Sequence, residues 1–205
     1  MIHFITSFDF SILHYFAQVR TLGGSYFFID VSELGSIVVI GALAVCTGLL
    51  LALLRRIPDI AGLTLSVGGS FLVMEIMKLL IQRPRPSIHF AAFIENGYSF
   101  PSGHAMIGVA FYCFLAFLIA HILPRGVTRR VALYTLPALA FLISFGRVYL
   151  GVHYASDVVV GMILGGIIAG ASIKLTLWLE RRFYSEAESV VVTETFSEVR
   201  VVVSE

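Results

Sequence analysis

Five long apolar segments, separated by short polar interruptions, dominate the hydrophobic pattern of this chain. They fall near residues 36–54, 61–81, 105–123, 131–150 and 158–179. A helix needs about 20 predominantly apolar residues to cross the hydrocarbon core of a bilayer, and each segment is close to that length. Small residues recur in all five, which suits close helix packing in a membrane. The pattern predicts an all-α fold, a polytopic transmembrane helical bundle with about five spans.

The first 35 residues follow a different pattern. Apolar residues between Ile2 and Val19 cover much of one helix, but Asp9 and His14 interrupt them. We expect residues 1–35 to form an N-terminal segment with an amphipathic helix at the membrane interface; the alternative is a sixth span over residues 2–19. The membrane-embedded domain then covers residues 36–182. Residues 183–205 form an acidic tail, for which we expect disorder or a weak hairpin.

The composition agrees with a membrane protein. Hydrophobic residues make up 58% of the chain, charged residues 13%, and the mean hydropathy is +0.93. A typical soluble domain carries about 25% charged residues. The formal net charge of +1 gives no reason to expect a nucleic-acid partner, so the expected partners are membrane lipids. Cys46 and Cys113 lie inside apolar runs and are expected to be free thiols.

The distribution of arginine predicts the orientation. Most loop arginines lie on one side of the predicted bundle: Arg55, Arg56, Arg125, Arg129, Arg130, Arg181 and Arg182. By the positive-inside rule that side is cytoplasmic. We therefore expect an integral protein of the bacterial inner membrane, or cell membrane. The loop 82–100 and the junction 147–157 should lie at its periplasmic or extracellular face.

Three polar clusters reach that outer face. They are Lys78 with Arg85-Pro86, then Pro101-Ser102-Gly103-His104, and finally Arg147 with His153 and Asp157. Ionisable groups in or beside a membrane span are costly, so they indicate function by default. Three basic groups, a hydroxyl, two imidazoles and a carboxylate gathered at one face favour a site for an anionic phosphate.

The spacing within the third cluster predicts a nucleophile. A helix that begins near Gly151 would place His153 and Asp157, four residues apart, on one face. The carboxylate can then accept the N–H of one ring nitrogen and leave the other nitrogen free to attack phosphorus. One continuous helix would point Arg147 away from His153, so Gly151 should mark a break.

The other two clusters supply donors for phosphate. Lys78 offers a point charge, and Arg85 can bind two phosphate oxygens at once. Ser102 is placed to cap the helix that begins near His104, and backbone N–H groups at a helix start bind phosphate well. We expect Arg83 to extend to lipid headgroups.

The order and spacing of these clusters resemble the three-part signature of the type 2 phosphatidic acid phosphatase superfamily. The matching residues are Lys78-x6-Arg85-Pro86, Pro101-Ser102-Gly103-His104 and Arg147-x5-His153-x3-Asp157. The resemblance covers roughly residues 61–179. It departs from the family at Gly146, where the family usually has Ser, and in its reduced first span.

The resemblance implies a membrane lipid phosphatase that acts through a phosphohistidine intermediate. His153 would be the nucleophile, His104 the general acid and then base, and Asp157 the residue that orients His153. Charge on the phosphoryl oxygens would be stabilised by Lys78, Arg85, Ser102, Gly103 and Arg147. No metal and no cofactor are expected, because the sequence offers no cluster of carboxylates at the site for Mg²⁺.

The substrate class is a lipid phosphate, but the sequence leaves its identity open. A polyprenyl diphosphate such as undecaprenyl diphosphate, phosphatidylglycerophosphate, phosphatidate and lipid A all fit. His89, Glu95 and Tyr98 in the loop 82–100 either contact the headgroup or are ordinary loop polarity. Phosphotransfer to another lipid and a small anion transporter are the alternatives. The oligomeric state is not indicated by the sequence.

Overall fold

The computed structural model describes the backbone of residues 2–203 and the side chains of residues 7–183. All regular secondary structure in this part of the chain is helical. The elements are α1 (Ile2–Val19), α2 (Leu22–Glu33), α3 (Ile37–Leu53), α4 (Ile57–Thr64), the π-helical turn η1 (Leu65–Gly69), α5 (Ser70–Ile81), α6 (Gly103–Ile122), α7 (Val127–Tyr149) and α8 (Ala155–Val203).

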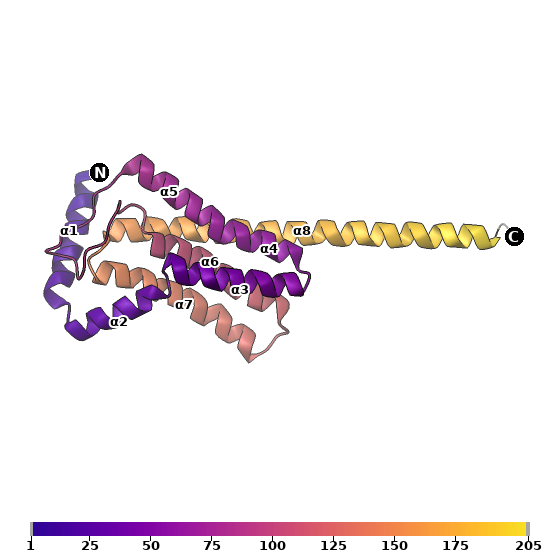
Figure 1. Ribbon diagram of the computed structural model, residues 1–205, viewed down its shortest axis with the longest axis horizontal. Coiled ribbons are helices and arrows are strands. Elements are labelled where there is room, and N and C mark those ends of the chain that lie inside the picture. Colours follow the sequence, from indigo (N-terminus) through magenta and orange to yellow (C-terminus); the bar gives the residue numbers. More distant parts are fainter. Residues whose placement is uncertain (1, 204–205) are drawn as a thin grey trace.

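Five helical segments are long and apolar enough to cross a membrane, as predicted. They are Leu22–Leu53, Ile57–Ile81, Gly103–Ile122, Val127–Tyr149 and Ala155–Phe183. Figure 1 shows that α3 to α8 run side by side along one direction. The first segment starts earlier than predicted, because α2 adds apolar residues ahead of α3. The second is one nearly continuous helix made of α4, η1 and α5.

Helix α6 forms the centre of the bundle. In the most apolar part of α6, 61% of the residues are buried, against 11% in the most apolar part of the segment made of α2 and α3. Phe111 and Phe114 of α6 are completely buried, whereas Leu53 of α3 is 83% exposed. Because the exposed side chains of α3 are apolar, α3 is suited to contact lipid. The first and third polar clusters lie on, or directly beside the ends of, helices that pack around α6.

Small residues allow α8 to approach α6 closely. A Cβ atom at Gly161 of α8 would lie 2.9 Å from the carbonyl oxygen of Ser102, at the start of α6. At the same end, a Cβ atom at Gly103 would lie 2.6 Å from Sδ of Met74 in α5. Small residues at membrane helix interfaces permit such close backbone contact. The packing brings the beginnings of α6 and α8 together.

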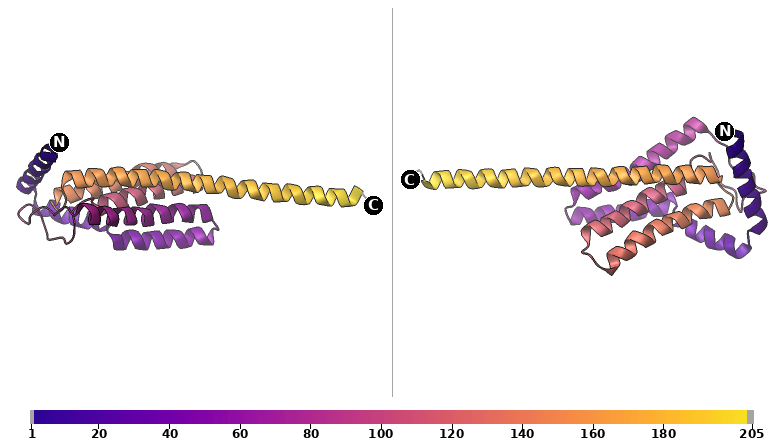
Figure 2. Two further views of the ribbon diagram at one scale, coloured as in Figure 1. Left: turned by 90° about the horizontal axis from the view of Figure 1, so that it is seen from above. Right: turned by 180° about the vertical axis from the view of Figure 1, so that it is seen from behind.

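Helix α1 lies across one end of the bundle and not alongside it (Figure 1; Figure 2, right). We call this the α1 end; it also carries the loop 82–102 and the junction between α7 and α8. The opposite end, here the far end, carries the loops between α3 and α4 and between α6 and α7. This placement suits the predicted interfacial helix, although its polar Asp9 is buried and faces the protein.

The C-terminal residues extend α8 well beyond the bundle. The backbone remains helical through Val203, so the disorder or weak hairpin considered from the sequence is not found. The side chains of residues 184–205 lie outside the described residues.

Candidate active site

The three polar clusters meet at the α1 end. Lys78 lies in the last turn of α5, His104 in the first turn of α6 and Arg147 in the last turn of α7. Each of these elements ends or begins beside the loop 82–102. His104 lies close enough to Lys78, Arg85, Arg147 and His153 to interact with each electrostatically. The fold therefore gathers all the predicted site residues, while their chemical roles remain predictions.

His153 is buried with one ring nitrogen facing the predicted phosphate-binding arginine. Its Nε2 atom lies 3.1 Å from an NH1 nitrogen of Arg85. A guanidinium can only donate, so Nε2 must be the unprotonated nitrogen in this arrangement and Nδ1 carries the proton. Burial lowers the pKa of His153 to about 4; nearby Arg147 acts in the same direction and Asp157 opposes it. The ring is thus a neutral base whose Nε2 lone pair accepts a hydrogen bond from Arg85.

Ser99 couples His153 to Asp157. The Nδ1 atom of His153 and Oδ2 of Asp157 are 3.7 Å apart, which is too long for a hydrogen bond. The hydroxyl of Ser99 lies 3.3 Å from that Nδ1 and donates a short hydrogen bond to the same carboxylate oxygen. The direct bond expected between His153 and Asp157 is therefore replaced by a bridge through Ser99, which no motif in the sequence indicated.

The turn between α7 and α8 also differs from the prediction. The chain breaks at Gly151 as expected, where φ is +69°, a conformation that favours glycine. However, α8 begins at Ala155, so His153 lies in the turn and not on the helix. The carboxylate of Asp157 accepts the backbone N–H of Tyr154 at 3.0 Å, which caps the start of α8. This cap sets the start of α8 after His153, so His153 lies outside the helix.

Glu95 joins the two arginines of the site. Arg85 NH1 lies 3.0 Å from Oε2 of Glu95, and Arg147 NH2 donates a short hydrogen bond to the same oxygen. The Arg147 side chain is only 3% exposed. A carboxylate held by two guanidinium groups occupies the kind of position that phosphate oxygens take. The contact made by Glu95 is therefore with the protein's own arginines.

Two buried donors of the site have no hydrogen-bond partner. They are the hydroxyl of Ser102 and Nε of Arg147. Ser102 does stand directly before α6, but its side chain makes no capping hydrogen bond, contrary to our expectation. An unpaired buried polar group costs about 1–3 kcal/mol, so such groups call for a ligand or another explanation. Both are suited to donate to an anion.

Arg83 does not reach toward lipid headgroups, and that prediction was wrong. Its guanidinium lies 2.7 Å from Oδ2 of Asp9 and 2.5 Å from Oδ1 of Asp157. It also stacks over the ring of Tyr154, 4.0 Å from the ring centre. Two buried carboxylates attract the guanidinium inward more strongly than the interface attracts it outward. The charged Asp9 inside an apolar helix was the one sequence signal for this contact.

Asp9 attaches α1 to the start of α8. Its carboxylate accepts the backbone N–H of Ser156 at 2.9 Å and the hydroxyl of Ser156 at 2.5 Å. At the other end of α1, Arg20 donates to the carbonyl oxygens of Phe90 and Leu150, both at 2.9 Å. Helix α1 therefore holds both the site loop and the turn that carries His153.

The carboxylates near His153 are each paired with arginine. Asp9 and Asp157 are engaged by Arg83, and Glu95 by Arg85 and Arg147. Metal ligation by these groups would require displacing arginine from each of them. Within residues 7–183, the group of His, Cys, Asp and Glu side chains with metal-ligand spacing lies at the far end instead.

The chain is similar to several known proteins. A family model described as the PAP2 superfamily matches residues 59–181. Phosphatidylglycerophosphatase B of Bacillus subtilis is 34% identical over 113 residues, which are 54% of this chain and 55% of that protein. Human dolichyldiphosphatase 1 is 32% identical over 125 residues, 57% of this chain and 50% of that protein. The chain thus spans about half the length of these relatives.

Two solved structures resemble this one more completely. A crystal structure of a transmembrane PAP2 type phosphatidylglycerolphosphate phosphatase from Bacillus subtilis has a TM-score of 0.75 at 26% identity, covering 83% of this chain and 85% of that one. The crystal structure of Aquifex aeolicus LpxE has a TM-score of 0.64 at 25% identity, covering 80% of this chain and 94% of that one. Both comparisons extend over the bundle that carries the site.

Proposed function

Because this chain belongs to the PAP2 superfamily, we propose that it is an integral-membrane lipid phosphatase that removes a terminal phosphoryl group from a lipid phosphate or diphosphate. The observation that carries the proposal is the pair of unpartnered buried donors, Ser102 Oγ and Arg147 Nε, beside Lys78 and Arg85. Together, these four side chains can donate hydrogen bonds to the three non-bridging oxygens of one phosphoryl group. The backbone N–H groups at Gly103, where α6 begins, add to them.

In the first step, the Nε2 lone pair of His153 attacks phosphorus. A P–N bond forms as the bond from phosphorus to the bridging oxygen breaks, and His104 gives its proton to the departing oxygen. The product is a phosphohistidine and a lipid alcohol, or a lipid monophosphate when the substrate is a diphosphate. Lys78, Arg85 and Arg147 stabilise the charge on the phosphoryl oxygens, which is the main task in phosphoryl transfer.

In the second step, water attacks the phosphohistidine. His104, now neutral, takes a proton from the water; the P–N bond breaks, and inorganic phosphate leaves with Nε2 of His153 restored. Ser99 and Asp157 hold Nδ1 of His153 on the side away from the reacting phosphorus throughout. Neither step requires a metal ion, and removing divalent cations with EDTA should leave kcat unchanged in the folded protein.

The setting of the site supports a substrate that lies in the membrane. The α1 end lies at the end of apolar helices, within reach of a lipid headgroup. The named activities of the relatives favour phosphatidylglycerophosphate and polyprenyl diphosphate over phosphatidate and lipid A. The arginines of the far-end loops favour a cytoplasmic far end, which supports a site at the outer face of the bacterial inner membrane.

A lipid phosphatase assay with trapping of the intermediate tests the proposal. Purified protein should release phosphate from at least one of the four lipid classes, and vanadate, which can adopt five-coordinate geometry, should inhibit it. His153→Ala should abolish turnover and labelling of the protein by substrate carrying radioactive phosphate. His104→Ala should slow turnover by about 10²–10⁴-fold, the usual contribution of a general acid.

His89→Ala is the matched control, because His89 lies in the same loop region without a place in the mechanism. It should keep near-normal turnover. Substantial steady-state hydrolysis by His153→Ala would overturn the assignment of the nucleophile, and release of phosphate from none of the lipids would overturn the proposed function.

A further inference from the structure

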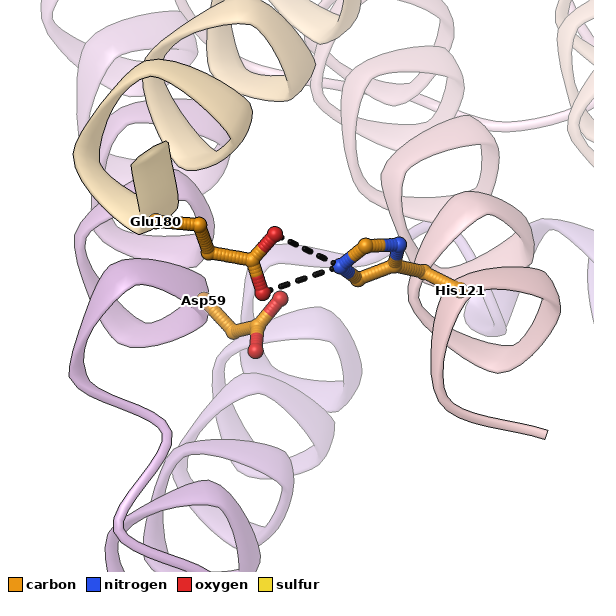
Figure 3. Close-up of side chains that lie close together, drawn as sticks. All are labelled: Asp59, His121 and Glu180. Atoms are coloured by element: carbon orange, nitrogen blue, oxygen red, sulfur yellow. Dashed lines mark hydrogen bonds and ion pairs between the residues drawn. The ribbon is translucent and has the colours of Figure 1, made fainter. Parts of the chain in front are cut away.

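Three side chains from three helices converge at the far end of the bundle (Figure 3). They are Asp59 in the first turn of α4, His121 in the last turn of α6 and Glu180 in α8. One ligand atom of each lies within 4.8 Å of the others. The Nε2 atom of His121 is 3.0 Å and 2.9 Å from the two carboxylate oxygens of Glu180. None of these residues takes part in the proposed phosphatase reaction.

Asp59 carries an unused ligand atom into this cluster. The residue is completely buried, and its Oδ1 atom has no hydrogen-bond partner. The other oxygen, Oδ2, accepts a short hydrogen bond from Nε of Arg56. Figure 3 shows the carboxylate directed at the space between Glu180 and His121. A buried carboxylate oxygen without a donor is an exception that calls for an explanation, and a bound cation supplies one.

The geometry around Glu180 also indicates a cation. Nε2 of His121 carries at most one proton, yet it faces both oxygens of Glu180 at similar distances. An ion between an imidazole nitrogen and carboxylate oxygens binds each at about 2.0–2.2 Å, so ligand atoms about 3 Å apart can share it. The His121 ring stacks on Phe117, with 5.0 Å between ring centres and 15° between planes, which fixes its direction.

An entry path leads to the cluster from the far end. A pocket of about 200 Å³ is lined by Asp59 and Glu180 together with Arg55, Arg56 and Phe183. Arg56 also binds Glu180 at 2.8 Å, so its guanidinium neutralises both carboxylates in the absence of another cation. A metal ion that enters must therefore compete with Arg56.

We propose that Asp59, His121 and Glu180 form a structural site for a divalent transition metal ion of the Zn²⁺ class. One imidazole and two carboxylates suit Zn²⁺ or Mn²⁺ better than Ca²⁺ or Mg²⁺, which prefer ligand sets made only of oxygen. The ion joins α4, α6 and α8 at the end opposite the active site. It supplies no chemistry to the phosphatase reaction and stabilises the folded bundle by binding only to the folded chain.

Metal binding to the full-length protein tests the proposal directly. The protein, purified in detergent and stripped with EDTA, is titrated with Co²⁺ and with Zn²⁺. We expect one Co²⁺ per chain with visible absorption bands from nitrogen and oxygen ligands, displacement of Co²⁺ by Zn²⁺, and a rise in Tm with Zn²⁺. His121→Gln should weaken Co²⁺ binding by about 100-fold and abolish the rise in Tm. His14→Gln, the matched control at the α1 end, should retain both.

A second variant keeps the test independent of folding defects. Arg56→Gln removes the competing guanidinium and leaves the three ligands in place, so it should tighten Zn²⁺ binding. Weaker binding by Arg56→Gln would overturn the competition between arginine and metal. Equal Co²⁺ binding by His121→Gln, or no saturable binding by the wild-type chain, would overturn the site and leave a closed network of ion pairs. Phosphatase activity in EDTA bears on neither outcome.

Discussion

Glu95 occupies the position between Arg85 and Arg147 that the proposed mechanism assigns to phosphate oxygens. One carboxylate oxygen contacts both guanidinium groups, so an arriving phosphate must displace it. The carboxylate compensates the charges of the buried Arg147 and the half-buried Arg85, because a buried charge without a partner is costly. It also opposes binding of any other anion. At the scale of single residues, the positive charges of Arg85 and Arg147 are therefore balanced by Glu95 before substrate binds.

Removing the charge of Glu95 should strengthen anion binding. We expect Glu95→Gln to lower the Ki of vanadate by about 5–10-fold, because the amide cannot hold both arginines as a carboxylate does. Competitive inhibition measured at constant ionic strength checks this. Asp30→Asn, the corresponding change at an exposed position of α2, should leave the Ki unaltered. A higher Ki in Glu95→Gln would show that the carboxylate only positions the arginines.

The buried imidazole of His153 should titrate far below a normal histidine. Its pKa of about 4 means that the ring stays neutral from pH 8 down to about pH 5, with the proton on Nδ1. Nitrogen NMR of histidine-labelled protein should show this tautomer, with the signal identified by its loss in His153→Gln. A transition of this signal near pH 6.5 would contradict the assignment.

The same pKa links pH to stability. The unfolded chain binds the proton near pH 6.5 and the folded chain only near pH 4. The unfolded state therefore binds more protons between these values, and the stability from neutral His153 is lost as pH falls from about 6.5 to about 4. Below that range this residue has no further effect on the pH dependence.

At the scale of elements, the site depends on how closely α6 and α8 approach one another. The catalytic turn and the start of α6 are joined by the N–H of Ser102, which donates to the carbonyl oxygen of Asp157 at 3.2 Å. Gly161 lies one turn further along α8 and meets the backbone of α6 without a side chain. Helix α1 then covers this junction through Asp9 and Arg20.

A methyl group at Gly161 should separate the two helices. Gly161→Ala places a Cβ atom 2.9 Å from a backbone oxygen that cannot move alone, so we expect a loss of about 1–3 kcal/mol, the usual cost of overpacking. Thermal unfolding in detergent measures the loss as a lower Tm. Gly166→Ala lies on the same helix with nothing within 4 Å, and its Tm should not fall. Equal Tm values for the two variants would mean that α8 is not tightly packed here.

At the scale of the whole molecule, the two ends of the bundle differ in chemistry. The α1 end gathers the buried ion pairs and the proposed phosphate site. The far end carries a basic pocket lined by Arg125, Arg129 and Arg130, together with the cluster of Asp59, His121 and Glu180. Exposed loop arginines favour the cytoplasmic side of a membrane. The whole molecule is thus polarised along the direction of its spans.

Cysteine labelling on intact cells tests this orientation. In a background without Cys46 and Cys113, Asn96→Cys at the α1 end should react with an impermeant thiol reagent, because this end should face outward. Val127→Cys at the start of α7 on the far end, where Val127 is 67% exposed, should react only after the cells are opened. The reverse pattern would place the active site at the cytoplasmic leaflet.

The sequence by itself determined the number and approximate positions of the spans and the residues that gather at one end. Span positions follow from the length of apolar runs, a local property that each segment carries independently. The break at Gly151 was also predicted, because a continuous helix could not bring Arg147 and His153 to one site. Signals of this kind depend on residues that are near one another in the chain.

Only the tertiary structure decided how the polar groups are paired. Ser99, Glu95, Arg83 and Asp9 come from a loop and from α1, where no period of the sequence relates them to Asp157 or Arg147. Asp59, His121 and Glu180 likewise lie on three separate helices. A buried charge takes whichever partner the packed helices bring within reach, and that choice depends on contacts far apart in the sequence.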